Sequence, residues 1–313
     1  MNTLWFACLS LLLAAALLNL CSYRLTQALR SLPHASASRW VPWLTLAFAL
    51  CPVLPDWLTA LWALSANHES LAMGTLIGGN LARIGLVLPL VTTAQPLLFN
   101  KNIITRDIPL LMIVSVMFLV LALDNHFARM DGLVLLTLFG IYALITFKRK
   151  GLPENIPENA LAPVAPLRIA LYCVGLALGA FLLASQSAVI ALRTGIHASW
   201  LGLGILATAL RGAEVSTALG AARKGQMADA VGTLIQSSTL TVLFSIGSLA
   251  LLRPLRVPLF ALTGPSWDIW VMLISSFVLL MLVGFNAPRS LNRPKAMILL
   301  LLFGSYLWWR LYS

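Results

Sequence analysis

Ten long apolar stretches take up most of this chain, and they leave it few soluble folds. They fall at residues 4–23, 41–66, 71–98, 108–123, 132–147, 169–191, 199–221, 228–252, 268–285 and 297–312. A helix that crosses the hydrocarbon layer of a membrane needs about 20 mostly apolar residues. Of the 313 residues, 60% are hydrophobic and 10% are charged, which is more apolar surface than a soluble domain can bury. We therefore expect an all-α polytopic protein of about ten transmembrane helices, with the lipid bilayer as its main partner.

The two halves of the chain share short motifs at a nearly constant offset. Gly-Thr-Leu-Ile at 74–77 recurs 158 residues later, at 232–235. Three more motifs recur at offsets of up to 164: Ala-Leu-Arg at 28–30 and 191–193, Asp-Ile at 107–108 and 268–269, and Phe-Gly-x-Tyr at 139–142 and 303–306. The pattern predicts two five-helix repeats, residues 1–147 and 169–313, joined by a polar linker at 148–168. Because five is odd, the second repeat enters the membrane from the other side, as in the inverted repeats of secondary transporters.

The basic residues indicate the orientation of the chain. The net charge is +11, but the lysines and arginines lie in short gaps between apolar stretches, where membrane topology explains them and nucleic-acid binding is not expected. Fourteen of the 21 lie in one alternate set of loops and five in the other, and Arg83 and Arg211 lie in no loop. Since cytoplasmic loops carry the excess of positive charge, we expect a cytoplasmic (inner) membrane protein with both termini outside and a cytoplasmic linker.

Ionisable side chains within the apolar stretches mark a candidate site, because they are costly at membrane depth. Asp56 and Glu214 each lie about halfway along a predicted helix and are also 158 residues apart, so a twofold axis in the membrane plane would bring them face to face. Arg83 lies at a similar depth in the next helix. Prolines and glycines interrupt these helices and free backbone carbonyl groups. Carbonyl and carboxylate oxygens together suit Na⁺, Ca²⁺ or H⁺.

Around these acids the chain resembles the cation/Ca²⁺ antiporter superfamily, the sodium/calcium exchangers. The first repeat reads "LPDWLTALWALSANHESLAMGTLIGGNLARIGLVLPL" and the second "LRGAEVSTALGAARKGQMADAVGTLIQSSTLTVLFSIG". The family carries a Pro-Glu element on one helix of each repeat and a Gly-Ser-Asn element on the next. The resemblance covers the whole chain and implies the ten-helix exchanger fold and a transported cation, with no enzyme activity and no bound cofactor.

The resemblance also implies which residues form the ion site, and where the chain departs from the family. Asp56 and Glu214 take the places of the two family glutamates, and the second has lost its proline to Ala213. The implied ion-binding residues, with the two acids as metal ligands, are Asp56, Glu214, Asn80, Ser237, Ser238 and Thr208. The residues implied to modulate the site are Arg83, Arg211, Gly78, Gly79 and Gln236. Arg83 replaces a family asparagine, and Arg211 falls in a stretch that normally carries small hydroxyl residues.

The two arginines alter the expected chemistry. Arg211 and Glu214 are three residues apart and share a helix face, and Arg83 is aimed at the same cavity. Two unit charges 4 Å apart interact by roughly 4 kcal/mol at an effective dielectric constant near 20, so a guanidinium competes with a bound cation. Ca²⁺ needs six to eight oxygens and strong negative charge. We therefore expect a Na⁺- or H⁺-coupled cation antiporter with an altered site. The alternative is an exchanger-fold protein that acts as a scaffold or partner without transport.

Overall fold

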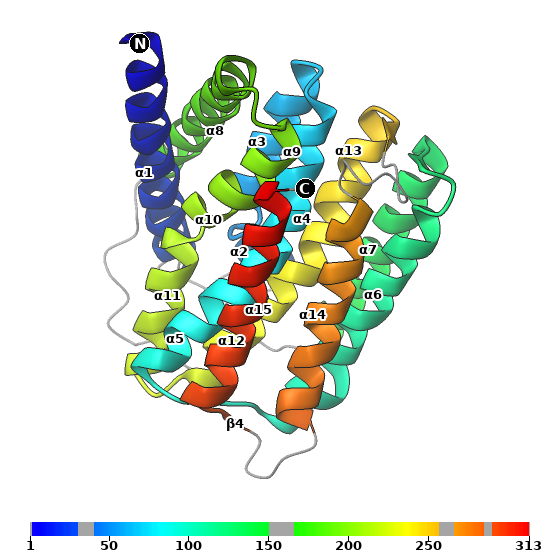
Figure 1. Ribbon diagram of the computed structural model, residues 1–313. Helices are drawn as coiled ribbons and strands as arrows, with labels where there is room; N and C mark the ends of the chain where they lie inside the picture. Colours follow the sequence, from blue (N-terminus) through cyan, green and yellow to red (C-terminus); the bar gives the residue numbers. More distant parts are fainter. Residues whose placement is uncertain (1, 31–40, 150–165, 257–265, 285–289, 313) are drawn as a thin grey trace.

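The computed structural model describes residues 2–30, 41–149, 166–256, 266–284 and 290–312, almost all of them helical (Figure 1). The first half contains α1 (Asn2–Arg30), α2 (Val41–Leu50), α3 (Leu54–Ser65), α4 (Glu69–Ala82), the π-helical segment η1 (Arg83–Val87), α5 (Leu88–Ala94), strand β1 (Leu97–Leu98), η2 (Ile103–Asp107), α6 (Ile108–Leu121), β2 (His126–Phe127) and α7 (Arg129–Arg149). The second half contains α8 (Pro166–Thr194), α9 (Ala198–Trp200), η3 (Leu201–Leu206), α10 (Ala207–Ala209), α11 (Gly212–Arg223), α12 (Met227–Leu240), η4 (Thr241–Ile246), α13 (Gly247–Leu252), β3 (Leu255–Arg256), α14 (Ser266–Gly284), β4 (Ser290–Leu291) and α15 (Arg293–Tyr312).

Each of the ten predicted spans corresponds to one helix or to one run of consecutive helices. Seven of the described runs are long and apolar enough to cross a membrane, judged by length and composition. Three runs are not among the seven. The runs α2–α3 and α9–α11 are each broken into shorter helices near the middle, and α15 is continuous but carries Arg293, Lys295 and Arg310 near its ends. Residues 150–165, the centre of the predicted linker, lie outside the described residues.

Two short strand pairs follow the symmetry between the two repeats. Strand β1 pairs with β4, and β2 pairs with β3, both antiparallel. The strands are related by the offsets of the sequence motifs, since β3 follows β1 by 158 residues and β4 follows β2 by 164. The operation that carries β1 to β3 and β2 to β4 therefore exchanges the two strand pairs, which is consistent with a twofold axis between the repeats.

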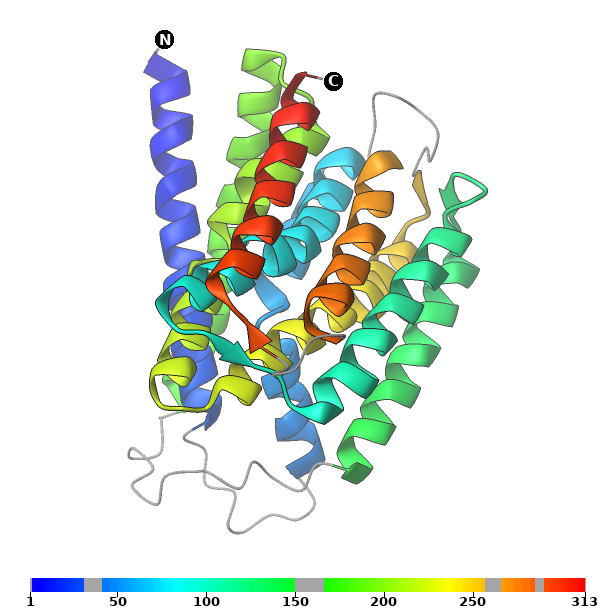
Figure 2. The same ribbon diagram turned by 60° about the horizontal axis from the view of Figure 1, so that its bottom comes forward.

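Both ends of the described chain lie on one face of the molecule, which we call the terminal face (Figures 1 and 2). The hairpin between α3 and α4 reaches this face. The equivalent hairpin of the second repeat, between α11 and α12, reaches the opposite face, where strand β4 also lies (Figure 1). The two hairpins thus enter the molecule from opposite sides and meet in its interior.

The recurring Asp-Ile and Phe-Gly-x-Tyr motifs hold the last two helices of the second repeat together. The Tyr306 hydroxyl on α15 donates a hydrogen bond to the carboxylate of Asp268 on α14. Arg310 Nε, one turn further along α15, donates to the same Asp268 oxygen at 3.2 Å. All three side chains are buried, so these polar contacts fix the register between the two helices.

Glycines let α4 pack backbone against backbone with α9 and η3, which come from the other repeat. A Cβ atom at Gly74 would lie 2.5 Å from the carbonyl oxygen of Ser199, and one at Gly78 would lie 2.5 Å from Cα of Leu203. From the other side, a Cβ at Gly202 would lie 2.6 Å from the carbonyl oxygen of Leu71. Small residues at such positions allow close helix contact within a membrane.

The first prediction concerns this contact. Gly78→Ala should destabilise the protein by about 1–3 kcal/mol, the usual cost of overpacking, because the clash is with backbone atoms that cannot move aside. Gly140→Ala is the matched control, since nothing lies within 4 Å of its Cβ position. Thermal unfolding in detergent would measure both variants. Equal midpoints for the two would contradict the packing described here.

Candidate ion site

The two buried acids each lie in the first turn of a half-helix. Residues 51–53 form a turn that separates α2 from α3, and Asp56 follows in the first turn of α3, next to Pro55. Residues 210–211 form the equivalent turn before α11, and Glu214 lies in the first turn of that helix. The N-terminus of a helix carries unpaired N–H groups and a partial positive charge, which stabilises a carboxylate there. The two helix breaks therefore place helix N-termini inside the bundle, where they stabilise the negative charges of Asp56 and Glu214.

Asn19 on α1 bridges the break in the second repeat. Its amide nitrogen donates to the carbonyl oxygen of Ala209 at 2.7 Å, and its oxygen accepts from the N–H of Ala213 at 2.7 Å. A Cβ atom at Gly212 would lie 3.0 Å from the amide oxygen and from the amide carbon of Asn19, so a glycine there makes room for the bridge. One side chain thus satisfies backbone groups on both sides of the interruption.

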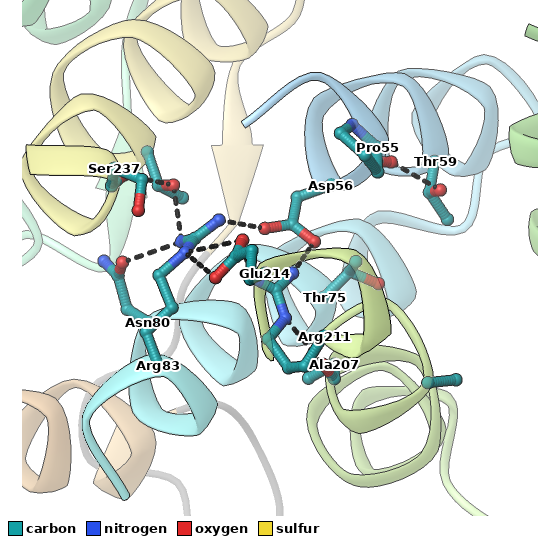
Figure 3. Close-up of polar contacts among 12 residues, drawn as sticks. Pro55, Asp56, Thr59, Thr75, Asn80, Arg83, Ala207, Arg211, Glu214 and Ser237 are labelled. Atoms are coloured by element: carbon teal, nitrogen blue, oxygen red, sulfur yellow. Dashed lines mark hydrogen bonds and ion pairs between the residues drawn. The ribbon is translucent and has the colours of Figure 1, made fainter. Parts of the chain in front are cut away.

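Asp56, Glu214, Arg83 and Arg211 form one continuous network of charges in the interior (Figure 3). Arg83 Nη2 donates to Asp56 Oδ2 at 2.6 Å, and Arg83 Nε donates to both Glu214 oxygens, at 3.1 and 3.2 Å. Arg211 donates to Asp56 Oδ1 through Nη2 and to Glu214 Oε1 through Nη1, at 2.5 Å in the latter case. Each arginine therefore joins both acids, and every carboxylate oxygen accepts at least one guanidinium hydrogen. We call these four residues the charge quartet.

Neutral groups complete the coordination of the two guanidiniums. Arg83 Nη1 donates to Thr241 Oγ1 at 2.8 Å and to Asn80 Oδ1 at 3.3 Å, and Arg211 Nε donates to the carbonyl oxygen of Ala207 at 3.0 Å. Arg83 and Thr241 are 158 residues apart and begin the equivalent segments η1 and η4. Two repeat-related positions thus contact each other, which puts the pseudo-twofold axis beside the quartet.

The quartet is almost completely buried. Asp56 and Arg83 are 0% exposed, Arg211 is 1% exposed and Glu214 is 6% exposed. Glu214 also lines a hollow of about 20 Å³ with Ser22, Thr26, Phe48, Pro52, Ala213, Thr217 and Thr233. Such a volume holds about one water molecule. Thr217 on α11 and Thr233 on α12 line the hollow, so Glu214, the most exposed member of the quartet, borders it from the side of these two helices.

The other residues that the resemblance implied for the site are placed as follows. Gly79 lies against the quartet, because a Cβ atom there would be 3.0 Å from Asp56 Oδ2, whereas Gly78 packs against Leu203. The Ser237 hydroxyl donates to its own helix, and the Ser237 carbonyl accepts from Thr241. The Ser238 hydroxyl is buried and has no hydrogen-bond partner among the described residues. The Thr208 hydroxyl donates to Gly204 and Ile205 carbonyls of its own helix, and Gln236 is partly buried.

Sequence reasoning missed Asn19 and the hydrogen bond from Arg83 to Thr241. Asn19 could have been noticed as the only amide side chain in an apolar stretch of α1. The partnership of Arg83 with Thr241 could have been found from their 158-residue spacing, which is the repeat offset.

The second prediction tests the buried pairing. Arg211→Met leaves two buried carboxylates short of a partner, and removal of one member of a buried ion pair costs about 3–5 kcal/mol. Arg253→Met removes an ion pair with Glu69, in which the Arg253 side chain is 44% exposed and the Glu69 side chain 27% exposed. It also removes hydrogen bonds to Asn67 and to the Leu64 carbonyl, and exposed ion pairs contribute at most about 1 kcal/mol. Thermal unfolding in detergent should show a much larger loss for the first variant. Similar losses would mean that the quartet is not buried as described.

The third prediction concerns the bridge across the helix break. Asn19→Ala leaves the Ala213 N–H and the Ala209 carbonyl without their partner, at a cost of about 1–3 kcal/mol for each buried group left unsatisfied. Ser10→Ala, on the same helix, removes only a hydroxyl that donates to the preceding turn and should be nearly neutral. The unfolding midpoints of the two variants would check this, and a neutral Asn19→Ala would rule out the bridge.

The fold is shared with known cation exchangers. A crystal structure of the H⁺/Ca²⁺ exchanger CAX superposes with a TM-score of 0.78 at 18% identity, covering 96% of this chain and 82% of that one. A structure of the sodium-calcium exchanger NCX_Mj superposes with a TM-score of 0.69 at 22% identity, covering 96% of this chain and 98% of that one.

The sequence comparisons agree. Inner membrane protein YrbG of Escherichia coli K12 is 27% identical over 269 residues, which is 82% of this chain and 81% of that protein. Membrane protein MJ0091 of Methanocaldococcus jannaschii is 28% identical over 226 residues, 71% of this chain and 74% of that protein. Residues 6–148 and 164–312 match the family described as sodium/calcium exchanger protein. The chain is therefore a multi-pass membrane protein that belongs to the sodium/calcium exchanger family, a family of transporters and not of enzymes.

Proposed function

We propose that this protein is a secondary active cation antiporter with an altered ion site, coupled to Na⁺ or H⁺. Asp56 and Glu214 are the groups that receive the cation, and Asn80 contributes a neutral oxygen beside them. Ser237, Ser238 and Thr208 lie on the helices around the site. The cation is the substrate, so the proposal requires no resident cofactor.

The observation that carries this proposal is the saturation of the carboxylates. All four carboxylate oxygens of Asp56 and Glu214 already accept guanidinium hydrogens. Ca²⁺ takes six to eight oxygen ligands, so both arginines would have to leave before it could bind. A proton needs only one carboxylate oxygen, and Na⁺ carries half the charge of Ca²⁺, so either has less need of both acids. The quartet therefore favours a monovalent cation over Ca²⁺.

Glu214 is the better candidate for the first contact with the cation. It lines the small hollow, whereas Asp56 is 0% exposed. Alternating access would follow from movement of one repeat against the other around the fixed pair of acids.

We propose the cytoplasmic membrane as its location, with the terminal face outside. The count of basic residues in the loops supports this orientation, and the name of the relative YrbG, an inner membrane protein, supports the membrane.

The fourth prediction tests transport itself. Purified protein in liposomes should move ²²Na⁺ or protons, read with a pH-sensitive dye, and should move ⁴⁵Ca²⁺ far more slowly. Asp56→Asn and Glu214→Gln should each lower the flux at least about tenfold, the factor that corresponds to about 1.4 kcal/mol, because each removes a charge that the cation must meet.

Asp229→Asn is the matched control, since Asp229 is an exposed carboxylate at the start of α12, and it should keep the full flux. Absence of flux under every imposed gradient would overturn the proposal in favour of a scaffold without transport. Rapid ⁴⁵Ca²⁺ flux with an intact quartet would overturn the selectivity.

A further inference from the structure

The quartet supplies its own counter-charges. Two guanidiniums and two carboxylates sum to zero charge, and their hydrogen-bonding groups find partners within the protein: Asn80, Thr241 and the Ala207 carbonyl receive the N–H groups that the acids do not. The close approach of Gly79 to Asp56 leaves no gap on that side. The four side chains therefore balance one another's charge within the protein.

The net charge of the site determines whether the carrier can switch between its access states without a bound cation. A carrier that closes over two carboxylates must bury two negative charges unless a cation accompanies them, and an unpaired charge at membrane depth is costly. The cation then determines whether the carrier can switch between its two access states, because a ligand shifts such an equilibrium by its differential affinity for them. Obligatory exchange follows from that dependence. In this protein the compensating charges are covalently attached.

We propose that Arg83 and Arg211 act as tethered counter-ions that let the empty carrier switch between its access states, so that the protein also carries out one-way movement of its cation without a counter-transported ion. This inference rests on the proposed function, because it concerns the same site and the same cation.

Two repeat-related threonines, Thr59 and Thr217, differ in their exposure and can be used to follow the access state of the carrier. Thr59 and Thr217 are 158 residues apart, and each lies one turn after the acid of its half-helix and donates to a backbone carbonyl, that of Pro55 or Ala213. Thr217 is partly exposed and lines the hollow that reaches Glu214, whereas Thr59 is 0% exposed. The two repeat-related positions thus differ in this structure, with a hollow beside the acid of the second repeat and a buried threonine beside the acid of the first.

Inverted repeats exchange their conformations when the carrier switches access. In the other access state Thr59 becomes exposed toward the terminal face and Thr217 becomes buried. The rate at which a thiol at position 59 reacts with a water-soluble reagent therefore measures how often that state is visited.

The experiment uses the full chain in lipid nanodiscs, where both faces are accessible. Cys8, Cys21, Cys51 and Cys173 are first replaced by alanine, and Thr59→Cys, Thr217→Cys or Lys224→Cys is then introduced. Lys224 is exposed, so its labelling rate normalises for reagent and pH. Labelling by a charged thiol reagent is followed with N-methylglucamine as the only added cation, and again with Na⁺ or Ca²⁺, at pH 7 and pH 9.

With the quartet intact, the normalised labelling of Thr59→Cys should change less than about threefold on addition of either cation or between the two pH values. The variant Arg83→Asn with Arg211→Ser removes the tethered charges. Without added cation, the labelling rate at position 59 in this variant should be at least about tenfold lower than with the quartet intact, a factor that corresponds to about 1.4 kcal/mol. The rate should recover when Na⁺ or Ca²⁺ is added.

The inference is overturned if, with the quartet intact, labelling at position 59 rises at least tenfold when Na⁺ or Ca²⁺ is added, or when the pH is lowered from 9 to 7. That result does not depend on whether the double variant folds. If liposome flux is present and labelling requires the cation, only this inference fails. If flux is absent and position 59 never reacts, the proposed transport fails with it.

Discussion

The pairing of two buried arginines with two buried carboxylates is the interaction on which the interior of this protein depends. Any one of these four charges, buried without a partner, would destabilise the protein strongly, because the effective desolvation penalty is several kcal/mol for each ion. They are tolerated because each guanidinium bridges both acids and each carboxylate oxygen has a donor. The helix breaks, the bridging Asn19 and the glycine beside Asp56 are all arranged around this network.

The sequence predicted the architecture well because the signals for it are redundant. Ten apolar stretches and four recurring motifs constrain the same ten helices, so an error at one boundary does not affect the topology. The offset of 158 residues was the strongest signal, since it relates Asp56 to Glu214, β1 to β3 and Arg83 to Thr241. The Asp-Ile and Phe-Gly-x-Tyr motifs recur on α14 and α15, where Asp268 and Tyr306 share a hydrogen bond.

The detailed coordination of the site was less predictable, for a physical reason. Sequence spacing indicates that Arg211 and Glu214 share a helix face, but it does not tell which distant group fills each remaining donor or acceptor. Asn19 bridges to α11 over 194 residues of sequence, and no local pattern predicts that. The π-helical segments η1 and η4 shift the register of the side chains next to Asn80 and Thr241, and a helical wheel with 3.6 residues per turn does not represent such a shift. The ion-binding roles of Asp56, Glu214, Asn80, Ser237, Ser238 and Thr208 all stay predictions.

The glycine contact between α4 and η3 has a consequence for how the chain is made. The two backbones touch through Gly78 and Leu203, which are separated by 125 residues of sequence. During synthesis α4 is therefore inserted long before its partner exists, with its glycine surface and Arg83 facing lipid or neighbouring chains. Neither repeat contains a finished interior of its own, so maturation has to wait for the second half. A newly made first half is the stage at which chaperones or membrane proteases would have the most to recognise.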